Sequence, residues 1–282
     1  MDAETYHFHI GNIECLAIND GTFAYHNPAE LFFTNATGEQ LAPALLTYGI
    51  IQYEWKEYLS PFTCLLVRTR SNTVLIDTGA GKGPVAGLGN LPDLMQKEGI
   101  PPEAVDTVLI THGHPDHLGG NTDPEGGVVF PNARFLISKS EWEYWSSDDV
   151  LANGGFFAQM VRKNMLAIQD RFSVVEPDLE VCPGILATAA EGHTPGHMMV
   201  SIHSRGRRLL VVSDAFLQPL HVEQPAWYSK VDIQPEVMVN TRRELIKKAA
   251  REQALVLAFH FPFPGLGNII QKDDGYCWEP LC

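Results

Sequence analysis

A cluster of histidines directly follows a buried strand-like run, and it limits what the chain can fold into more than any other feature. Residues 105–110 are mostly apolar, and His112, His114, Asp116 and His117 come within the next seven positions. The glycine and the proline between them are expected to prevent a regular helix, so the side chains can turn toward a common point. Residues two positions apart point the same way from an extended backbone, whereas adjacent residues point apart. The segment can therefore supply ligands to two metal ions that lie close together.

Three other polar residues also stand at the ends of predicted strands. His197 closes a short turn of glycine and proline, Asp214 follows the apolar residues 209–212, and His260 ends the apolar residues 255–259. Binding and catalytic residues are common in loops that a rigid scaffold positions. Imidazole and carboxylate groups suit Zn²⁺, and also Fe²⁺, Mn²⁺ or Co²⁺. We therefore predict two divalent metal ions, zinc first, in preference to a merely solvated polar loop.

Strand-like runs precede helical runs in each half of the chain. Alternating or β-branched apolar runs predict strands, and apolar spacings of three and four predict helices. Two sheets packed face to face with helices outside would bury the apolar side of every element. We therefore predict an α/β (α+β) protein with a single domain over residues 1–282. The predicted strands are residues 13–18, 63–67, 73–76, 105–110, 134–137, 185–189, 199–203, 209–212 and 255–259, and the predicted helices are residues 91–97, 141–145, 156–168 and 236–252.

The segment of residues 22–61 is long and poorly periodic. It is rich in Phe, Tyr, Leu and Pro, so we expect it to be ordered. Such a segment can form an apolar wall of a substrate pocket or a contact between two copies of the chain. We predict Phe32, Tyr53 and Trp55 as substrate-binding residues of this insertion, with packing in the core or a homodimer contact as the alternative role.

The composition excludes several classes of partner. The formal net charge is −14, and so acidic a surface repels phosphate backbones, so we expect no binding to nucleic acid. No apolar run is long enough to cross a membrane, and no basic and apolar leader follows Met1. The five cysteines are scattered and form no CxxC pair, which is typical of a reducing cytoplasm, with a Cys277–Cys282 pairing as the alternative. We predict a cytoplasmic protein that acts on a small molecule.

The motifs as a set resemble those of the metallo-β-lactamase superfamily. The likeness begins at Leu75-Ile76-Asp77-Thr78-Gly79 and continues through the H-x-H-x-D-H segment. It goes on with Gly192-His193-Thr194-Pro195-Gly196-His197 and ends with Ser213-Asp214 and His260. The resemblance implies a four-layer αβ/βα sandwich with the metals at one edge.

The resemblance also implies a role for each residue of the site. His112, His114 and His197 would hold the first metal, Asp116, His117 and His260 would hold the second, and Asp214 would bridge both. His193 and Asp77 are expected to support these ligands through hydrogen bonds, with direct metal binding as the alternative role of His193.

The implied chemistry is hydrolysis by a hydroxide that bridges the two metals. Metal ions about 3.5–4 Å apart can hold such a hydroxide at neutral pH and polarise the scissile oxygen. The hydroxide attacks a carbonyl carbon or a phosphorus atom, and the predicted catalytic residues Asp116 and Asp214 are the candidates to pass the proton to the leaving group. We expect ester, lactone or phosphotriester bonds in small, mostly apolar substrates.

Within the superfamily, the chain looks most similar to the branch that contains methyl parathion hydrolase and quorum-quenching lactonases. Lactonases have a tyrosine three residues after the bridging aspartate, and several relatives have histidine there, but this chain has Leu217. We expect Leu217 to line the substrate pocket and to favour substrates with good leaving groups. The group that polarises the substrate carbonyl would then lie elsewhere, with Tyr25, His26 and His221 as the candidates, or it would be the metal alone.

Other functions remain open on the same fold. A β-lactamase-like enzyme is one alternative, although most zinc β-lactamases of two subclasses have cysteine where this chain has Asp214. A thioesterase of the glyoxalase II type shares the ligand set, but it needs basic residues for glutathione that the sequence does not identify. A non-catalytic metal-binding protein would be expected to lack a ligand, and here all seven expected ligands are present.

Overall fold

The computed structural model describes residues 4–83 and 85–281, and its strands form two mixed sheets. The first has the order β1-β2-β3-β4-β5-β6-β7, and the second has the order β14-β13-β12-β11-β10-β9-β8. Strands β4 to β7 run parallel, as do β11 and β12, and the other neighbours are antiparallel. The first sheet contains β1 (Thr5–Ile10), β2 (Ile13–His26), β3 (Glu57–Arg68), β4 (Thr73–Ile76), β5 (Thr107–Leu109), β6 (Arg134–Ser138) and β7 (Phe172–Val175). The second contains β8 (Leu179–Cys182), β9 (Ile185–Ala189), β10 (Met198–Ser204), β11 (Arg207–Val211), β12 (Leu255–Leu257), β13 (Leu266–Lys272) and β14 (Gly275–Pro280).

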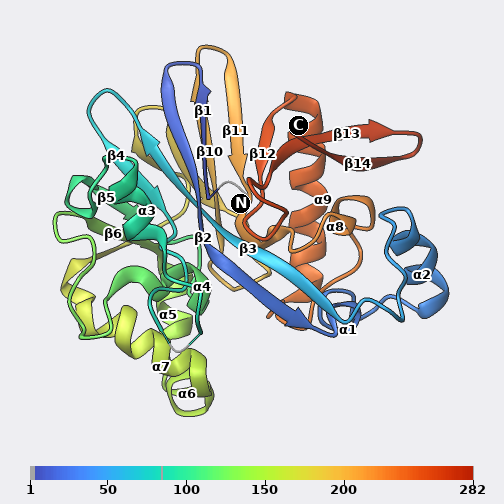
Figure 1. Ribbon diagram of the computed structural model, residues 1–282, viewed down its shortest axis with the longest axis horizontal. Coiled ribbons are helices and arrows are strands. Elements are labelled where there is room, and N and C mark those ends of the chain that lie inside the picture. The colour runs from blue at the N-terminus through green and yellow to red at the C-terminus, as the bar shows by residue number, and fades with distance from the viewer. Residues whose placement is uncertain (1–3, 84, 282) are drawn as a thin grey trace.

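Both faces of each sheet are covered, which gives four layers (Figure 1). Along β3, Leu65 and Val67 face the second sheet while Cys64 and Leu66 face helices, because successive strand side chains point to opposite faces. Helices α3, α5 and α7 cover the first sheet, and α9 covers the second. This arrangement confirms the predicted αβ/βα sandwich. The α-helices are α1 (Pro28–Phe32), α2 (Gly38–Leu46), α3 (Leu91–Lys97), α4 (Pro115–Leu118), α5 (Lys139–Trp145), α6 (Asp148–Asn153), α7 (Gly155–Asn164), α8 (Leu220–Glu223) and α9 (Pro235–Glu252).

The segment of residues 22–61 is only partly an insertion. Residues 22–26 continue β2 and pair with residues 57–61 of β3, and the part with α1 and α2 lies at the far end of this ribbon (Figure 1). Phe33 and Trp227 meet in an apolar cluster that packs this part against the chain after β11. The sequence pattern does not predict the strand residues of this segment, because a register shift just before residue 22 disturbs the alternation of apolar and polar side chains.

The described chain contains free thiols and no span for a membrane. Cys15, Cys64 and Cys182 are buried free thiols, and Cys277 is a partly exposed one. Cys282, its alternative partner, lies outside the described residues. No helix in the described ranges is both long and apolar enough to cross a bilayer. A cytoplasmic location stays a prediction.

Candidate metal centre

Loops at the ends of neighbouring strands gather the polar residues at one edge of the sandwich. Asp77 directly follows β4, and His112 comes soon after β5, its parallel neighbour. Asp214 and His260 come in the same way after the parallel pair β11 and β12. The carboxyl ends of parallel strands meet at one edge of a sheet, so each sheet contributes two of these four loops.

The segment from His112 to His117 differs from its predicted conformation at Pro115. Pro115 does not prevent a helix but begins one, the single turn α4, and His114 is the cap residue before it. Proline suits the first helical position because its φ is already helical and its missing N–H would have had no partner. The turn separates Asp116 and His117 from His112 and His114, which belong to a different ligand group.

Two groups of side chains could each hold a metal ion. Within each group, the ligand atoms all lie within 4.8 Å of one another. In the first group, His193 Nε2 lies 2.9 Å from His114 Nδ1 and 3.2 Å from Asp214 Oδ2. His112 Nε2 lies 3.7 Å from the same carboxylate oxygen. The first group is His112, His114, His193 and Asp214, and the second is Asp116, His117 and His260.

Asp214 also contacts the second group. Its Oδ1 lies 3.2 Å from His117 Nε2, and its Oδ2 lies 3.1 Å from His260 Nε2. His260 Nε2 is in turn 3.4 Å from Asp116 Oδ2. One buried carboxylate therefore lies between the two groups of histidines.

Several atoms of the centre are buried without a partner, which tests whether it fits a metal. His112 Nε2, His117 Nε2 and Asp214 Oδ1 have no hydrogen-bond partner within the described chain. An unsatisfied buried polar atom costs about 1–3 kcal/mol, so three in one place need an explanation. Burial, followed by neighbouring histidines, lowers the pKa of His112 and His114 well below the usual range, so both rings are neutral at pH 7. Neutral imidazoles and carboxylates with free lone pairs fit divalent cations.

His193 and His197 occupy each other's expected places. His197 uses both ring nitrogens inside the protein: Nδ1 donates to the Ala190 carbonyl at 3.0 Å, and Nε2 accepts from the Asp214 N–H at 3.2 Å. No lone pair of that ring remains for a metal. His193 directs Nε2 at His114 and Asp214 instead, so the geometry differs from the prediction that grouped His197 with His112 and His114.

Two buried aspartates orient histidines of the centre from outside. Asp77 accepts a hydrogen bond from His117 Nδ1 at 2.8 Å, and Asp232 accepts one from His193 Nδ1 at 2.8 Å. Each bond places the ring proton on Nδ1 and leaves Nε2 facing the centre. Asp77 thus lies where the sequence prediction put it, whereas Asp232 was missed because it stands in a loop 39 residues from its partner.

Arg242 stands behind Asp232 and was also missed. It is completely buried, and its Nη2 lies 3.7 Å from Asp232 Oδ2. Arg242 Nε donates to the Ala215 carbonyl at 2.7 Å, next to Asp214. A signal for it exists in the sequence, because Arg242 falls at helical spacing in the apolar stripe of α9 that includes Met238 and Leu245.

Glu141, another residue that was missed, ties two loops of the centre together. Its Oε1 accepts from Gly113 N–H at 2.7 Å and Trp145 Nε1–H at 2.5 Å, and its Oε2 accepts from Thr194 Oγ1–H at 2.7 Å and Gly196 N–H at 2.9 Å. Gly113 belongs to the His112–His117 loop, and the other loop carries His193. A carboxylate accepts four such hydrogen bonds only when it is ionised. The four bonds offset the free-energy cost of burying its charge.

Replacement of this carboxylate should weaken the whole fold. Glu141→Gln replaces one acceptor oxygen by an NH₂ donor that would face two other donors, so buried donors lose their partners. We expect the free energy of unfolding to fall by about 2–4 kcal/mol, measured by urea denaturation. Glu143→Gln, on the exposed side of the same helix, should change it by less than about 0.5 kcal/mol. Equal stability of the two variants would contradict this account.

A small pocket opens beside the ligand groups. Its volume is about 100 Å³, and apolar side chains dominate its walls. Phe32 and Leu217 lie in this pocket, as the sequence predicts for substrate-binding residues. The residues that line it are Tyr25, Leu31, Phe32, His114, Asp116, Phe157, Asp214, Leu217, Val231 and His260.

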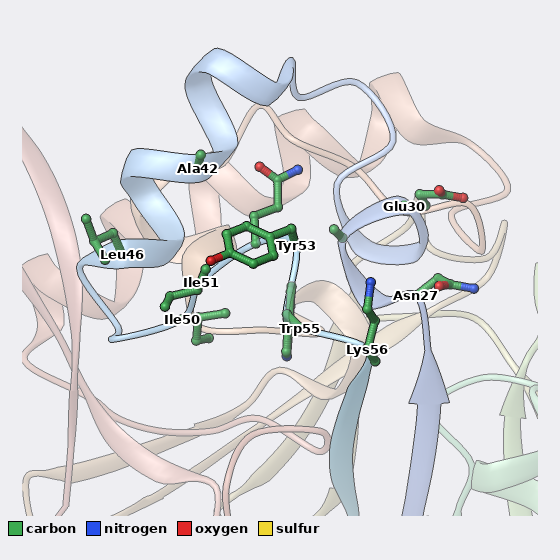
Figure 2. A pocket seen from close by; sticks show the side chains of 11 residues that line it. Asn27, Glu30, Ala42, Leu46, Ile50, Ile51, Tyr53, Trp55 and Lys56 are labelled. Atoms are coloured by element: carbon green, nitrogen blue, oxygen red, sulfur yellow. The ribbon is translucent and has the colours of Figure 1, made fainter.

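Tyr53 and Trp55 do not line this pocket, and their part in substrate binding stays a prediction. Figure 2 shows both beside a separate hollow of about 490 Å³ on the segment that carries α1 and α2. Tyr53 is 73% exposed there, and Trp55 packs against Phe33 and Tyr58. Their alternative role, a contact between two copies of the chain, stays a prediction.

The fold is an αβ/βα sandwich that carries groups of histidine and aspartate residues at its strand ends. Residues 61–260 match the family model of the Metallo-beta-lactamase superfamily, and the chain belongs to this superfamily. It is 23% identical over 220 residues to an N-acyl homoserine lactonase of Bacillus thuringiensis. This alignment covers 71% of this chain and 81% of that protein. It is 29% identical over 182 residues to the N-acyl homoserine lactonase AttM of Rhizobium radiobacter, which covers 60% of this chain and 63% of that protein.

Two solved structures superpose over almost the whole chain. The hydrolase AbOPH of the beta lactamase superfamily has a TM-score of 0.89 and 26% identity, and the match covers 100% of this chain and 99% of that one. The dizinc quorum-quenching lactonase AidC has a TM-score of 0.87 and 24% identity, and the match covers 99% and 97%. The predicted superfamily is confirmed, its lactonase relatives agree with the predicted branch, and the chain is a metal-dependent hydrolase.

Proposed function

We propose that this chain is a dinuclear metal-dependent hydrolase of ester bonds, with lactones and aryl esters as its main substrates and phosphotriesters as further ones. The observation that carries the proposal is Asp214, a buried carboxylate in contact with both groups of histidines. A carboxylate shared in this way offsets the mutual repulsion of two cations. Zinc suits the nitrogen and oxygen ligands best, with Fe, Mn or Co as alternatives.

The ligands follow from the free lone pairs. His112, His114 and His193 would hold the first ion, and Asp116, His117 and His260 the second, with Asp214 between them. His193 replaces His197 in this assignment because its Nε2 lies among the ligand atoms of His114 and Asp214, whereas the Nε2 of His197 faces the backbone N–H of Asp214. His197 instead holds the backbone of Asp214 in position.

Bound in these positions, two metal ions supply an activated water and polarise the scissile oxygen. The protein must then deliver a proton to the leaving group. Asp116 suits this task better than Asp214, because its side chain is 17% exposed and lines the pocket, whereas that of Asp214 is 3% exposed. We therefore assign the proton transfer to Asp116 and keep Asp214 as a ligand.

The walls of the pocket favour small, neutral, apolar substrates. Among its described lining residues there is no lysine or arginine that would pair with an anionic group. Leu31, Phe32, Phe157 and Leu217 supply apolar surface instead. This composition argues against β-lactams and glutathione thioesters, both of which carry carboxylates, and agrees with substrates of the lactonase kind that the relatives are named for.

A substrate panel tests the proposed function. Zinc-supplemented protein should hydrolyse acyl-homoserine lactones or aryl esters, with less turnover of phosphotriesters and none of β-lactams or glutathione thioesters. A chelator should abolish the activity, and Zn²⁺, Mn²⁺ or Co²⁺ should restore it, because the ligands are present without the ion. Metal-loaded protein that cleaves none of these substrates would support the non-catalytic alternative. Turnover of β-lactams alone would support the β-lactamase alternative, and turnover of glutathione thioesters alone would support the thioesterase alternative.

A further inference from the structure

A hydrogen-bond donor in the pocket would add to the stabilisation that bound metals give to the negative charge developing during ester cleavage. Such donors contribute one of the largest parts of the rate in acyl transfer. Leu217 lies in the pocket wall and has no donor to offer. His114, Asp116, Asp214 and His260 are already proposed as ligands. Among the described lining residues, Tyr25 is then the remaining side chain with an O–H or N–H group.

The two histidines that the sequence offered as donors lie elsewhere. The side chain of His26 is 71% exposed and pairs with Glu57 at 3.2 Å. His221 is buried, but its Nδ1 accepts from the Leu217 N–H at 3.3 Å and its Nε2 donates to the Phe32 carbonyl at 2.9 Å. Neither histidine lines the pocket.

Tyr25 stands near the end of β2, held between the pocket wall and a proposed ligand. Its ring packs edge-on against Phe32 with centroids 5.6 Å apart, and edge-on against His260 with centroids 6.0 Å apart. It shares the pocket lining with Asp116 and Asp214. The phenolic hydroxyl of tyrosine carries an O–H group, so it can donate a hydrogen bond.

We propose that the Tyr25 hydroxyl donates a hydrogen bond to the carbonyl oxygen of the scissile ester and is a catalytic residue of this enzyme. The assignment rests on the proposed esterase and lactonase function. As water adds to the acyl carbon and passes a proton to Asp116, the carbonyl π pair moves onto the oxygen, and the Tyr25 O–H stabilises that charge. The pair returns when the C–O bond breaks, the leaving alkoxide takes the proton that Asp116 accepted, and Tyr25 keeps its own. A lactone yields the hydroxy acid.

Tyr25→Phe tests this role because it removes the hydroxyl and keeps the ring that packs against Phe32 and His260. We expect kcat for an acyl-homoserine lactone to fall by about 10²–10³, with little change in KM. The loss for an aryl ester should be smaller, since a good leaving group needs less help from the donor. Metal content, measured by elemental analysis, should equal that of the unmodified protein.

Tyr48→Phe is the matched control. The Tyr48 hydroxyl donates to Glu223 at 2.6 Å, and the residue does not line the pocket, so kcat should stay unchanged. An unchanged lactone kcat in Tyr25→Phe, an equal loss for both leaving groups, or a loss of metal would each overturn the proposal while ester hydrolysis by the unmodified protein stands. If the unmodified, metal-loaded protein cleaves no ester, the proposed function fails and the role of Tyr25 fails with it.

Discussion

Asp214→Ala is expected to lose hydrolysis almost completely and to lose metal with it. The carboxylate contacts both sets of histidines, so its removal takes a ligand from each ion and leaves their charges facing each other. The loss in kcat should exceed the roughly 10²–10³ that removal of a single oxyanion donor costs. Unmodified protein should carry about two ions per chain, measured by elemental analysis beside the kinetics.

The control variant removes an aspartate side chain from the protein surface. Asp274→Ala, at an exposed position, should retain both the metal content and the activity. A folded Asp214→Ala variant that still binds two ions and turns over substrate would reject the shared-carboxylate assignment. A reproducible content of one ion in the unmodified protein after metal supplementation would reject the dinuclear site itself.

His193→Ala and His197→Ala should separate two histidines that lie four residues apart. The Nε2 of His193 faces His114 and Asp214, so His193→Ala should lose about one metal ion and nearly all activity. His197 only holds the Asp214 backbone, so His197→Ala should keep two ions at saturating zinc and lose about 10–100-fold in activity or affinity, as expected of a supporting residue. A zinc titration of both variants measures the difference.

The opposite result would restore the assignment that the sequence suggests. If His197→Ala loses an ion and His193→Ala keeps both, the ring nitrogens of His197 must exchange their partners when metal binds. Urea denaturation of both metal-free variants shows whether either loss comes from unfolding instead.

The positions of the four loops at the strand ends could be predicted, because the residues that mark each loop are neighbours in the sequence. A run of apolar residues marks the strand before His112, Asp214 and His260, and a polar residue at its end marks the edge of the sheet. The same runs predict the sandwich, since strands such as β3 are apolar on both faces only when two layers cover them. Hydrophobic pattern and spacing were sufficient for these features.

The choice between His193 and His197 could not be predicted, because it depends on backbone geometry between them. Gly192 has φ +129°, and a side chain there would meet the backbone of Met238; at Gly196 it would meet the backbone of Glu141. Contacts with distant elements therefore orient this turn. Glu141 and Asp232 were missed for the same reason: the residues of the metal-centre loops to which they bond lie at least 28 residues away in the sequence.

The proposed metal ligands and the apolar residues that form the pocket walls come from separate segments of the chain. The proposed ligands stand on strand-end loops that Glu141 and Asp77 lock together. The apolar walls come from α1, from α7 and from residues 217–231, in which α8 separates Leu217 from Val231. Substitutions in those three segments can reshape the cavity without touching a metal ligand. Descendants of such a chain could change their preferred leaving group or acyl length in single mutational steps while the hydrolytic machinery is inherited intact.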